Sequence, residues 1–151
     1  MTILSHTLSA SYIAVVSSGA NSAQTGLIAA AVISGAVVDL DHLYYFWKDR
    51  SLMKRGNLHN ARSMFHELIG FAVAGSSMLL LSFINQQLAY VIGVSMMVHL
   101  VEDVLVGKTI PFSPIDKTEF NLLPQSFKLK VVLDILVSCI FGVLWIKFLN
   151  G

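Results

Sequence analysis

Residues 129–149 read LKVVLDILVSCIFGVLWIKFL, and this stretch indicates the class of the protein. Its charged residues are Lys130, Asp134 and Lys147, and the two lysines lie near its ends. A helix needs about 20 apolar residues to cross the hydrocarbon core of a bilayer, so this segment is long enough to span it. Over the whole chain 55% of residues are hydrophobic and 13% are charged, about half the charge of an average soluble domain. Both observations predict an integral membrane protein rather than a soluble helical core.

Four further apolar stretches precede this segment, at about residues 3–18, 25–40, 66–84 and 87–106. A length of 151 residues fits one domain, so we predict a single all-α domain over residues 1–151. It would be a polytopic membrane helix bundle of about five helices. The first two stretches are short for a full span, and we expect them to be tilted or partly interfacial. Small residues recur every four positions in the second stretch, which favours close helix packing.

The basic residues predict how the bundle lies in the membrane. Nine of the ten Lys and Arg residues fall in two long connections, at residues 47–62 and 107–130. Cytoplasmic loops carry an excess of Lys and Arg, so these connections, and with them the N-terminus, are predicted to be cytoplasmic. The expected location is the cell inner membrane, with several passes. No Lys or Arg precedes Lys48, so we expect the first stretch to be retained rather than removed as a signal.

Histidines and carboxylates gather at the ends of these stretches that the orientation places in the cytoplasm. Ionisable groups within hydrophobic helices usually face the bundle interior and mark a functional site. We therefore predict a metal site at the cytoplasmic end of the bundle. The candidate ligands are His6, Asp39, Asp41, His42, His66, His99 and Asp103.

These candidates differ in what the sequence alone says of them. His99 and Asp103 are spaced i, i+4 and share one helix face. If the second helix continues past residue 40, Asp39 and His42 share a face, whereas a turn there could aim Asp41 inward. His42 could equally support a ligand or contact a lipid headgroup. His59 is the weakest of the five histidines and could be a polar loop residue.

Two further residues are candidates for catalysis, Arg62 and Glu102. Arg62 could neutralise a phosphate, or it could be one more cytoplasmic positive charge. Glu102 directly precedes Asp103 and lies on a different face of the helix. It could be a general base or a partner that orients a ligand.

The mixture of imidazole and carboxylate ligands suits Zn²⁺, with Mn²⁺ or Fe²⁺ as alternatives. A catalytic zinc lowers the pKa of its water to about 7, which provides a nucleophile at neutral pH. The chain has no Gly-x-Ser-x-Gly elbow, Walker loop or dinucleotide fingerprint, so metal-assisted hydrolysis is the reaction class that fits best.

The alternative is a non-catalytic membrane protein with a structural metal, acting as a scaffold or partner-binding module. A transporter would need ligands nearer the bilayer midplane. A net charge of +1 indicates no attraction to nucleic acid.

The order of these residues resembles the predicted membrane-bound metal-dependent hydrolases, also described as LexA-binding, inner-membrane-associated hydrolases. The motifs that carry the resemblance are an early His, Asp-x-Asp-His, Arg and His four residues apart, His-Leu-x-x-Asp and Pro-Phe-Ser. They correspond here to His6, Asp39 to His42, Arg62 and His66, His99 to Asp103, and Pro111 to Ser113. Ala61 and Glu67 depart from the pattern. The family has a His at the position of Ala61 and a Ser at the position of Glu67. The usual proline before Asp-x-Asp-His is Val38 here.

The ligand order is also similar to that of zinc-dependent phospholipase C. That likeness implies one metal on Asp41, His66, His99 and Asp103, and a second on His6 with Asp103 bridging. Because the predicted site would lie at headgroup depth beside Arg62 and other basic residues, we expect a phosphoester substrate, such as a membrane lipid headgroup. The later ligands of that enzyme class have no counterpart, because no histidine follows His99.

Overall fold

The computed structural model describes residues 2–40, 64–112, 115–116, 118–124 and 126–151. Most of these residues are helical, which confirms the predicted all-α bundle of about five helices. The α-helices are α1 (Ile3–Ser17), α2 (Thr25–Val37), α5 (Leu68–Ser82), α6 (Gln86–Val106) and α7 (Phe127–Asn150). A short 3-10 helix, η2 (Met64–His66), comes directly before α5. Between α6 and α7 a small antiparallel ladder joins β1 (Lys108–Thr109) to β2 (Phe120–Asn121), which the sequence did not predict.

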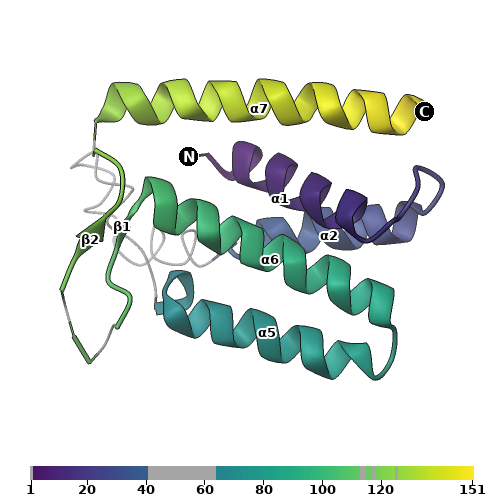
Figure 1. Ribbon diagram of the computed structural model, residues 1–151, viewed down its shortest axis with the longest axis horizontal. Helices are drawn as coiled ribbons and strands as arrows, with labels where there is room; N and C mark the ends of the chain where they lie inside the picture. The colour runs from purple at the N-terminus through teal and green to yellow at the C-terminus, as the bar shows by residue number, and fades with distance from the viewer. Residues whose placement is uncertain (1, 41–63, 113–114, 117, 125) are drawn as a thin grey trace.

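Successive described helices run in alternating directions along one axis (Figure 1). As a result, the start of α1, the end of α2, the start of α5 and the end of α6 all lie at the end of the bundle that carries the β1–β2 ladder. Helix α6 is central, since it packs against α1, α2 and α5, whereas α7 packs on α1. This arrangement brings together four segments that are far apart in the sequence, as the predicted site requires.

Helix α7 has the strongest membrane character of the described helices. Only 6% of its most apolar 18-residue window is buried, although that window has a mean hydropathy of 2.3. A core helix of a soluble protein would bury such a surface against other elements. Helix α6 is also long and apolar enough to cross a bilayer. The described residues thus contain two helices, α6 and α7, that are long enough and apolar enough to span a membrane.

Helices α1, α2 and α5 are shorter than a full span, with 15, 13 and 15 residues. At 1.5 Å per residue each is about 20–23 Å long, against a hydrocarbon core of about 30 Å. The third helix was predicted from His66 to Ile84, but regular α-helix begins only at Leu68. The reason is that Glu67 has an extended backbone, with φ −113° and ψ −165°, which separates η2 from α5.

Small residues allow α2 to approach α6 closely. A Cβ added to Gly35 would lie 2.9 Å from the hydroxyl oxygen of Ser95, and Ser95 donates a hydrogen bond of 2.8 Å to the carbonyl of Ala31. Gly26, in the other predicted stripe of small residues on this helix, has nothing within 4 Å of such a Cβ. Gly35 therefore allows close packing in the part of α2 nearer the histidines, whereas Gly26 does not contribute to it.

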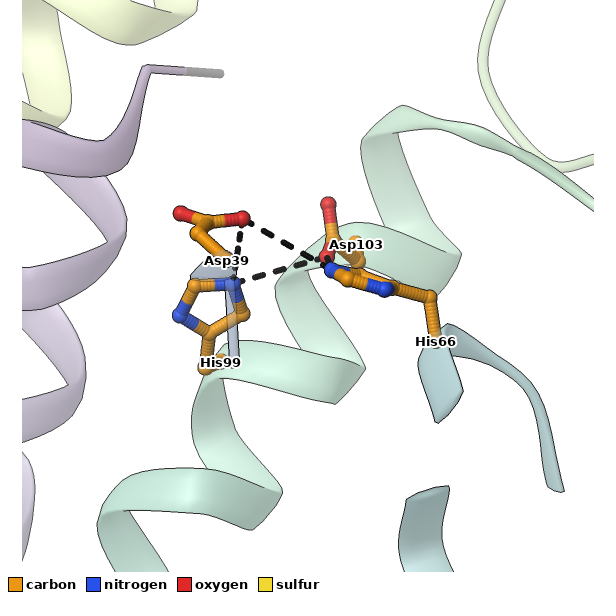
Figure 2. Close-up of side chains that lie close together, drawn as sticks. All are labelled: Asp39, His66, His99 and Asp103. Atoms are coloured by element: carbon orange, nitrogen blue, oxygen red, sulfur yellow. Dashed lines mark ion pairs between the residues drawn. The ribbon is translucent and has the colours of Figure 1, made fainter. Parts of the chain in front are cut away.

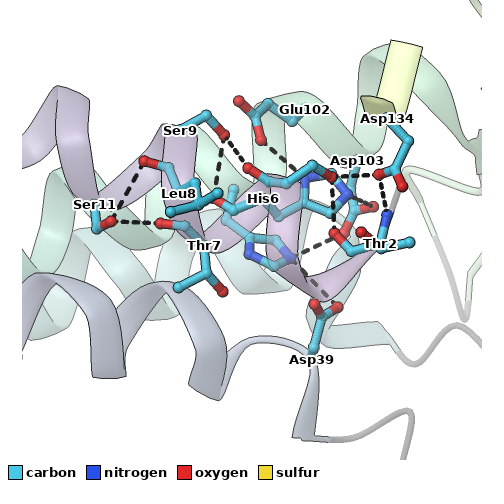
Figure 3. A network of polar contacts seen from close by, with 12 residues as sticks. Thr2, His6, Thr7, Leu8, Ser9, Ser11, Asp39, Glu102, Asp103 and Asp134 are labelled. Atoms are coloured by element: carbon cyan, nitrogen blue, oxygen red, sulfur yellow. Dashed lines mark hydrogen bonds and ion pairs between the residues drawn. The ribbon is translucent and has the colours of Figure 1, made fainter. Parts of the chain in front are cut away.

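Asp134 fixes the start of α1 to α7. Its Oδ1 accepts a hydrogen bond of 2.6 Å from the backbone N–H of Thr2 and one of 2.5 Å from the hydroxyl of Ser5. The first N–H groups of a helix have no intrahelical acceptor, and α1 has no side-chain cap of its own. Asp134 supplies this acceptor from another helix, and so it holds the turn that carries His6 (Figure 3).

Candidate metal centre

Four side chains from three segments of the chain meet at the ladder end of the bundle: Asp39, His66, His99 and Asp103 (Figure 2). Asp39 lies in the turn after α2, His66 ends η2, and the other two lie one turn apart on α6. Their relative exposures are 9%, 0%, 0% and 5%. Buried charges in proteins are generally paired or bound to a metal ion, so this cluster requires a specific explanation.

The separations within the cluster indicate what holds it together. Oδ1 of Asp39 lies 3.6 Å from Nε2 of His66 and 3.4 Å from Nε2 of His99. Oδ2 of Asp103 lies 3.5 Å from each of the same two nitrogens. These separations exceed the range of about 2.7–3.2 Å expected for an N–H···O hydrogen bond.

The same separations match the edges of a metal coordination tetrahedron. Zinc lies about 2.0–2.2 Å from nitrogen and oxygen ligands, which places neighbouring ligands of a tetrahedron about 3.3–3.6 Å apart. All four nitrogen–oxygen separations, from 3.4 to 3.6 Å, fall on this value, and the four atoms lie within 4.8 Å of one another. The four atoms could therefore hold one metal ion between them.

The chemistry of His99 also fits a metal ion. Among the described residues, neither of its ring nitrogens has a hydrogen-bond partner, and the ring is fully buried. A buried polar group left without a partner costs about 1–3 kcal/mol. A metal ion bound at Nε2 would remove part of that cost. Two imidazole nitrogens and two carboxylate oxygens form a donor set that suits Zn²⁺, Mn²⁺ or Fe²⁺.

Asp39 lies beyond the end of α2 and is held as an anion. Its burial would raise the pKa of the carboxyl group, but the contacts with the imidazoles of His66 and His99 outweigh burial. The result is a pKa well below the usual range. Since a carboxylate must be deprotonated to bind a metal, Asp39 is already in the form that a ligand needs.

His6 and Glu102 form a second imidazole–carboxylate pair beside the cluster (Figure 3). Nδ1 of His6 lies 2.8 Å from Oε2 of Glu102, and its Nε2 lies 3.5 Å from Oδ1 of Asp103. The His6 ring stacks on that of His99, with 4.5 Å between the ring centroids. Asp103 therefore directs one oxygen to the four-residue cluster and the other to His6. The role of His6 as a ligand to a second ion stays a prediction.

Asp39, the first carboxylate of the Asp-x-Asp-His motif, is in the cluster. The helix does not continue past Val37, and it is Asp39 that joins His66, His99 and Asp103. The likeness to phospholipase C had assigned that place to Asp41. Asp41, His42, His59 and Arg62 lie outside the described residues.

Two contributors to the site were not predicted from the sequence, Glu67 and Gly70. Oε1 of the buried Glu67 accepts a hydrogen bond of 2.9 Å from the backbone N–H of Ile110, which ties the segment after β1 to the start of α5. A Cβ added to Gly70 would lie 1.8 Å from the carbonyl oxygen of Phe65. Only a glycine therefore allows η2 and His66 to sit against α5 in this position.

Fold and site together define an all-helical membrane protein with a buried cluster that could hold a metal ion. A family model described as YdjM inner membrane protein matches residues 1–150, so the chain belongs to the YdjM inner membrane protein family. This confirms the predicted membrane-associated family and supports a location in the inner membrane. No curated protein matches the chain, and no solved structure matches it.

Proposed function

We propose that this protein is a metal-dependent hydrolase of the inner membrane and that its substrate is a phosphoester. The observation that carries the proposal is the set of four nitrogen–oxygen separations of 3.4–3.6 Å in a buried cluster. The ligands would be Asp39, His66, His99 and Asp103. Zn²⁺ is the metal we expect. Bound there, it would activate water and stabilise the charge that develops on a phosphoryl group.

The side chains of this site have distinct tasks in such a reaction. His66 and His99 are the nitrogen donors, and two carboxylates, Asp39 and Asp103, balance the charge of a divalent cation. Glu102 is the general-base candidate, because its side chain is 17% exposed and can exchange protons with solvent more readily than the buried carboxylates. The hydrogen bond between Glu102 and Nδ1 of His6 places a shared proton next to the metal cluster. Arg62 is proposed to bind the phosphate.

The place of the cluster at the ends of the helices supports a substrate that includes a lipid headgroup. Helix ends in a membrane bundle lie near the headgroup region. The positive-inside rule assigns this end to the cytoplasmic side, so the N-terminus and the site are proposed to be cytoplasmic. The distant likeness to zinc-dependent phospholipase C agrees with this substrate class, as an analogy only.

One observation favours a second candidate function, a structural metal in a scaffold protein. Four protein donors fill a tetrahedron, whereas catalytic zinc sites usually have three protein ligands and an open position. Zinc can expand to five ligands during a reaction, so the four donors do not decide between the two functions. The pair formed by His6 and Glu102 favours hydrolysis, because a structural site does not need a further proton-carrying group.

The substitution Glu102→Gln separates the two functions. We expect the purified variant to retain its metal, as measured by elemental analysis. Its hydrolysis of a chromogenic phosphodiester and of phospholipid vesicles should fall roughly 100- to 10,000-fold, the usual contribution of a general base. Glu119→Gln is the matched control, since Glu119 pairs with Lys108 in the ladder and should leave turnover unchanged. A wild-type protein that binds metal but hydrolyses neither substrate would favour the scaffold.

A further inference from the structure

An apolar groove lies beside the metal cluster, between α2 and α5. Both helices pack on α6, which forms the floor of the groove. Its volume is about 210 Å³. The side chains described around it carry no charge and no hydroxyl or amide group: Val37, Val38, Phe65, Gly70, Val73, Met96 and Leu100. Such a lining has no partner for a sugar, a base or a charged group.

The groove adjoins three of the four proposed ligands. Val38 directly precedes Asp39, Phe65 directly precedes His66, and Leu100 directly follows His99. From Leu100 the floor runs back to Met96, one turn of α6 or about 6 Å along the helix axis. The groove therefore extends from the level of the cluster toward the middle of the bundle.

The walls of the groove open sideways, toward the surroundings of the bundle. Val37, Phe65 and Val73 are 45%, 52% and 40% exposed. In a protein of an inner membrane family, exposed apolar side chains below a helix end face the hydrocarbon of the bilayer. The groove thus opens toward the lipid phase at one side, and three of its lining residues are chain neighbours of the proposed ligands.

From this geometry we infer that the groove binds the first part of an acyl chain of a membrane lipid, with the phosphate-bearing head at the cluster. The inference rests on the proposed function and names its substrate class, a phospholipid. About 6 Å of groove fits only the chain carbons nearest the headgroup. The rest of the chain stays in the bilayer, which explains why so small a groove is sufficient.

A larger cavity of about 310 Å³ provides an internal comparison. It lies between α5, α6 and the ladder, and the α6 residues that line it are Val101, Val104 and Leu105. At about 100° per residue these three lie on the side of α6 opposite His99 and Asp103. Glu67, which directly follows His66, also lines this cavity, but its Val101 side faces away from the cluster, so filling it at Val101 should not affect turnover.

The test uses Val73→Phe to fill the groove and Val101→Phe to fill the comparison cavity. Both are valines with similar exposure, 40% and 45%, so each has space for a larger side chain.

The full-length protein is placed in phosphatidylethanolamine–phosphatidylglycerol vesicles that contain a phospholipid with a photoreactive group near the ester end of its chain. Labelled peptides are identified by mass spectrometry. We expect label to be enriched on residues 65–73 and 96–100 over α7, and to fall roughly tenfold in Val73→Phe only.

Turnover measurements link the groove to the substrate. Val73→Phe should lower hydrolysis of phospholipid vesicles roughly tenfold, as the loss of about two buried methylene contacts would. Hydrolysis of a water-soluble chromogenic phosphodiester and the metal content should stay unchanged.

Three results would overturn the inference. They are equal label on the groove and on α7, cross-links to a second copy of the chain in the groove, and wild-type phospholipid turnover in Val73→Phe. If the wild-type protein hydrolyses neither substrate but the groove is labelled, the proposed hydrolase is wrong and the lipid groove stands.

Discussion

Replacing Asp103 with alanine is expected to remove bound metal from the purified protein. Oδ2 of Asp103 lies 3.5 Å from His66 and His99, and its Oδ1 lies 3.5 Å from His6, so Asp103 joins the four-residue cluster to His6. The variant retains one carboxylate in the cluster, too few to balance a divalent cation in a buried site. Metal content should fall from about one ion per chain to background. Phosphoester turnover should fall at least roughly 1,000-fold, as the loss of several kcal/mol of transition-state stabilisation implies.

The adjacent residue is the matched control. Glu102→Ala removes a carboxylate from the same turn of α6, but from outside the four-residue cluster. We expect it to retain metal although it loses turnover. A stable Asp103→Ala protein with full metal content would show that the ion binds elsewhere.

Substitution of Gly70 by alanine is the second large effect that we expect, although Gly70 is no ligand. The added Cβ would lie 1.8 Å from the carbonyl oxygen and 2.8 Å from the carbonyl carbon of Phe65. Both atoms are backbone, so no side-chain rotation relieves the contact, and η2 must move away from α5. His66 moves with it. A displacement of about 1 Å takes a ligand outside the ±0.2 Å tolerance of a metal–ligand distance. Metal affinity, measured by titration with a competing chelator, should fall at least roughly tenfold, since one of four ligands is misplaced.

Gly26→Ala and Gly142→Ala are the controls for this prediction. A Cβ added to either has nothing within 4 Å. In an exposed helix interior, alanine is favoured over glycine by roughly 0.5–1 kcal/mol, so these variants should be as stable as the wild type or slightly more so. Wild-type metal affinity in Gly70→Ala would contradict the position assigned to His66.

The sequence predicted those parts of the fold and site that depend on composition and helical spacing. Helix α7 was evident from a long apolar run, and His99 and Asp103 share a face because residues four apart in a helix always do. The common location of the histidines followed from counting helices of alternating direction, which needs no tertiary detail. The structure confirms the helix and the shared face, and it confirms the common location for the described histidines, His6, His66 and His99.

The features that the sequence did not predict depend on local turns and on contacts between distant segments. Asp39 reaches the cluster from the turn after α2, and no glycine or proline follows Val37 to mark that helix end in the sequence. The hydrogen bonds of Asp134 to the start of α1 and of Glu67 to Ile110 join residues distant in the chain. The ladder has strands of two residues each, too short for an alternating pattern to be visible.

X-ray absorption at the metal edge, with elemental analysis of the purified wild-type protein, tests the central claim most directly. The account predicts about one divalent ion per chain in the cluster, four nitrogen and oxygen neighbours at about 2.0–2.2 Å, and an imidazole scattering signal from two histidines. Protein that is purified without chelators and binds no divalent ion even after addition of Zn²⁺, Mn²⁺ or Fe²⁺ would contradict it.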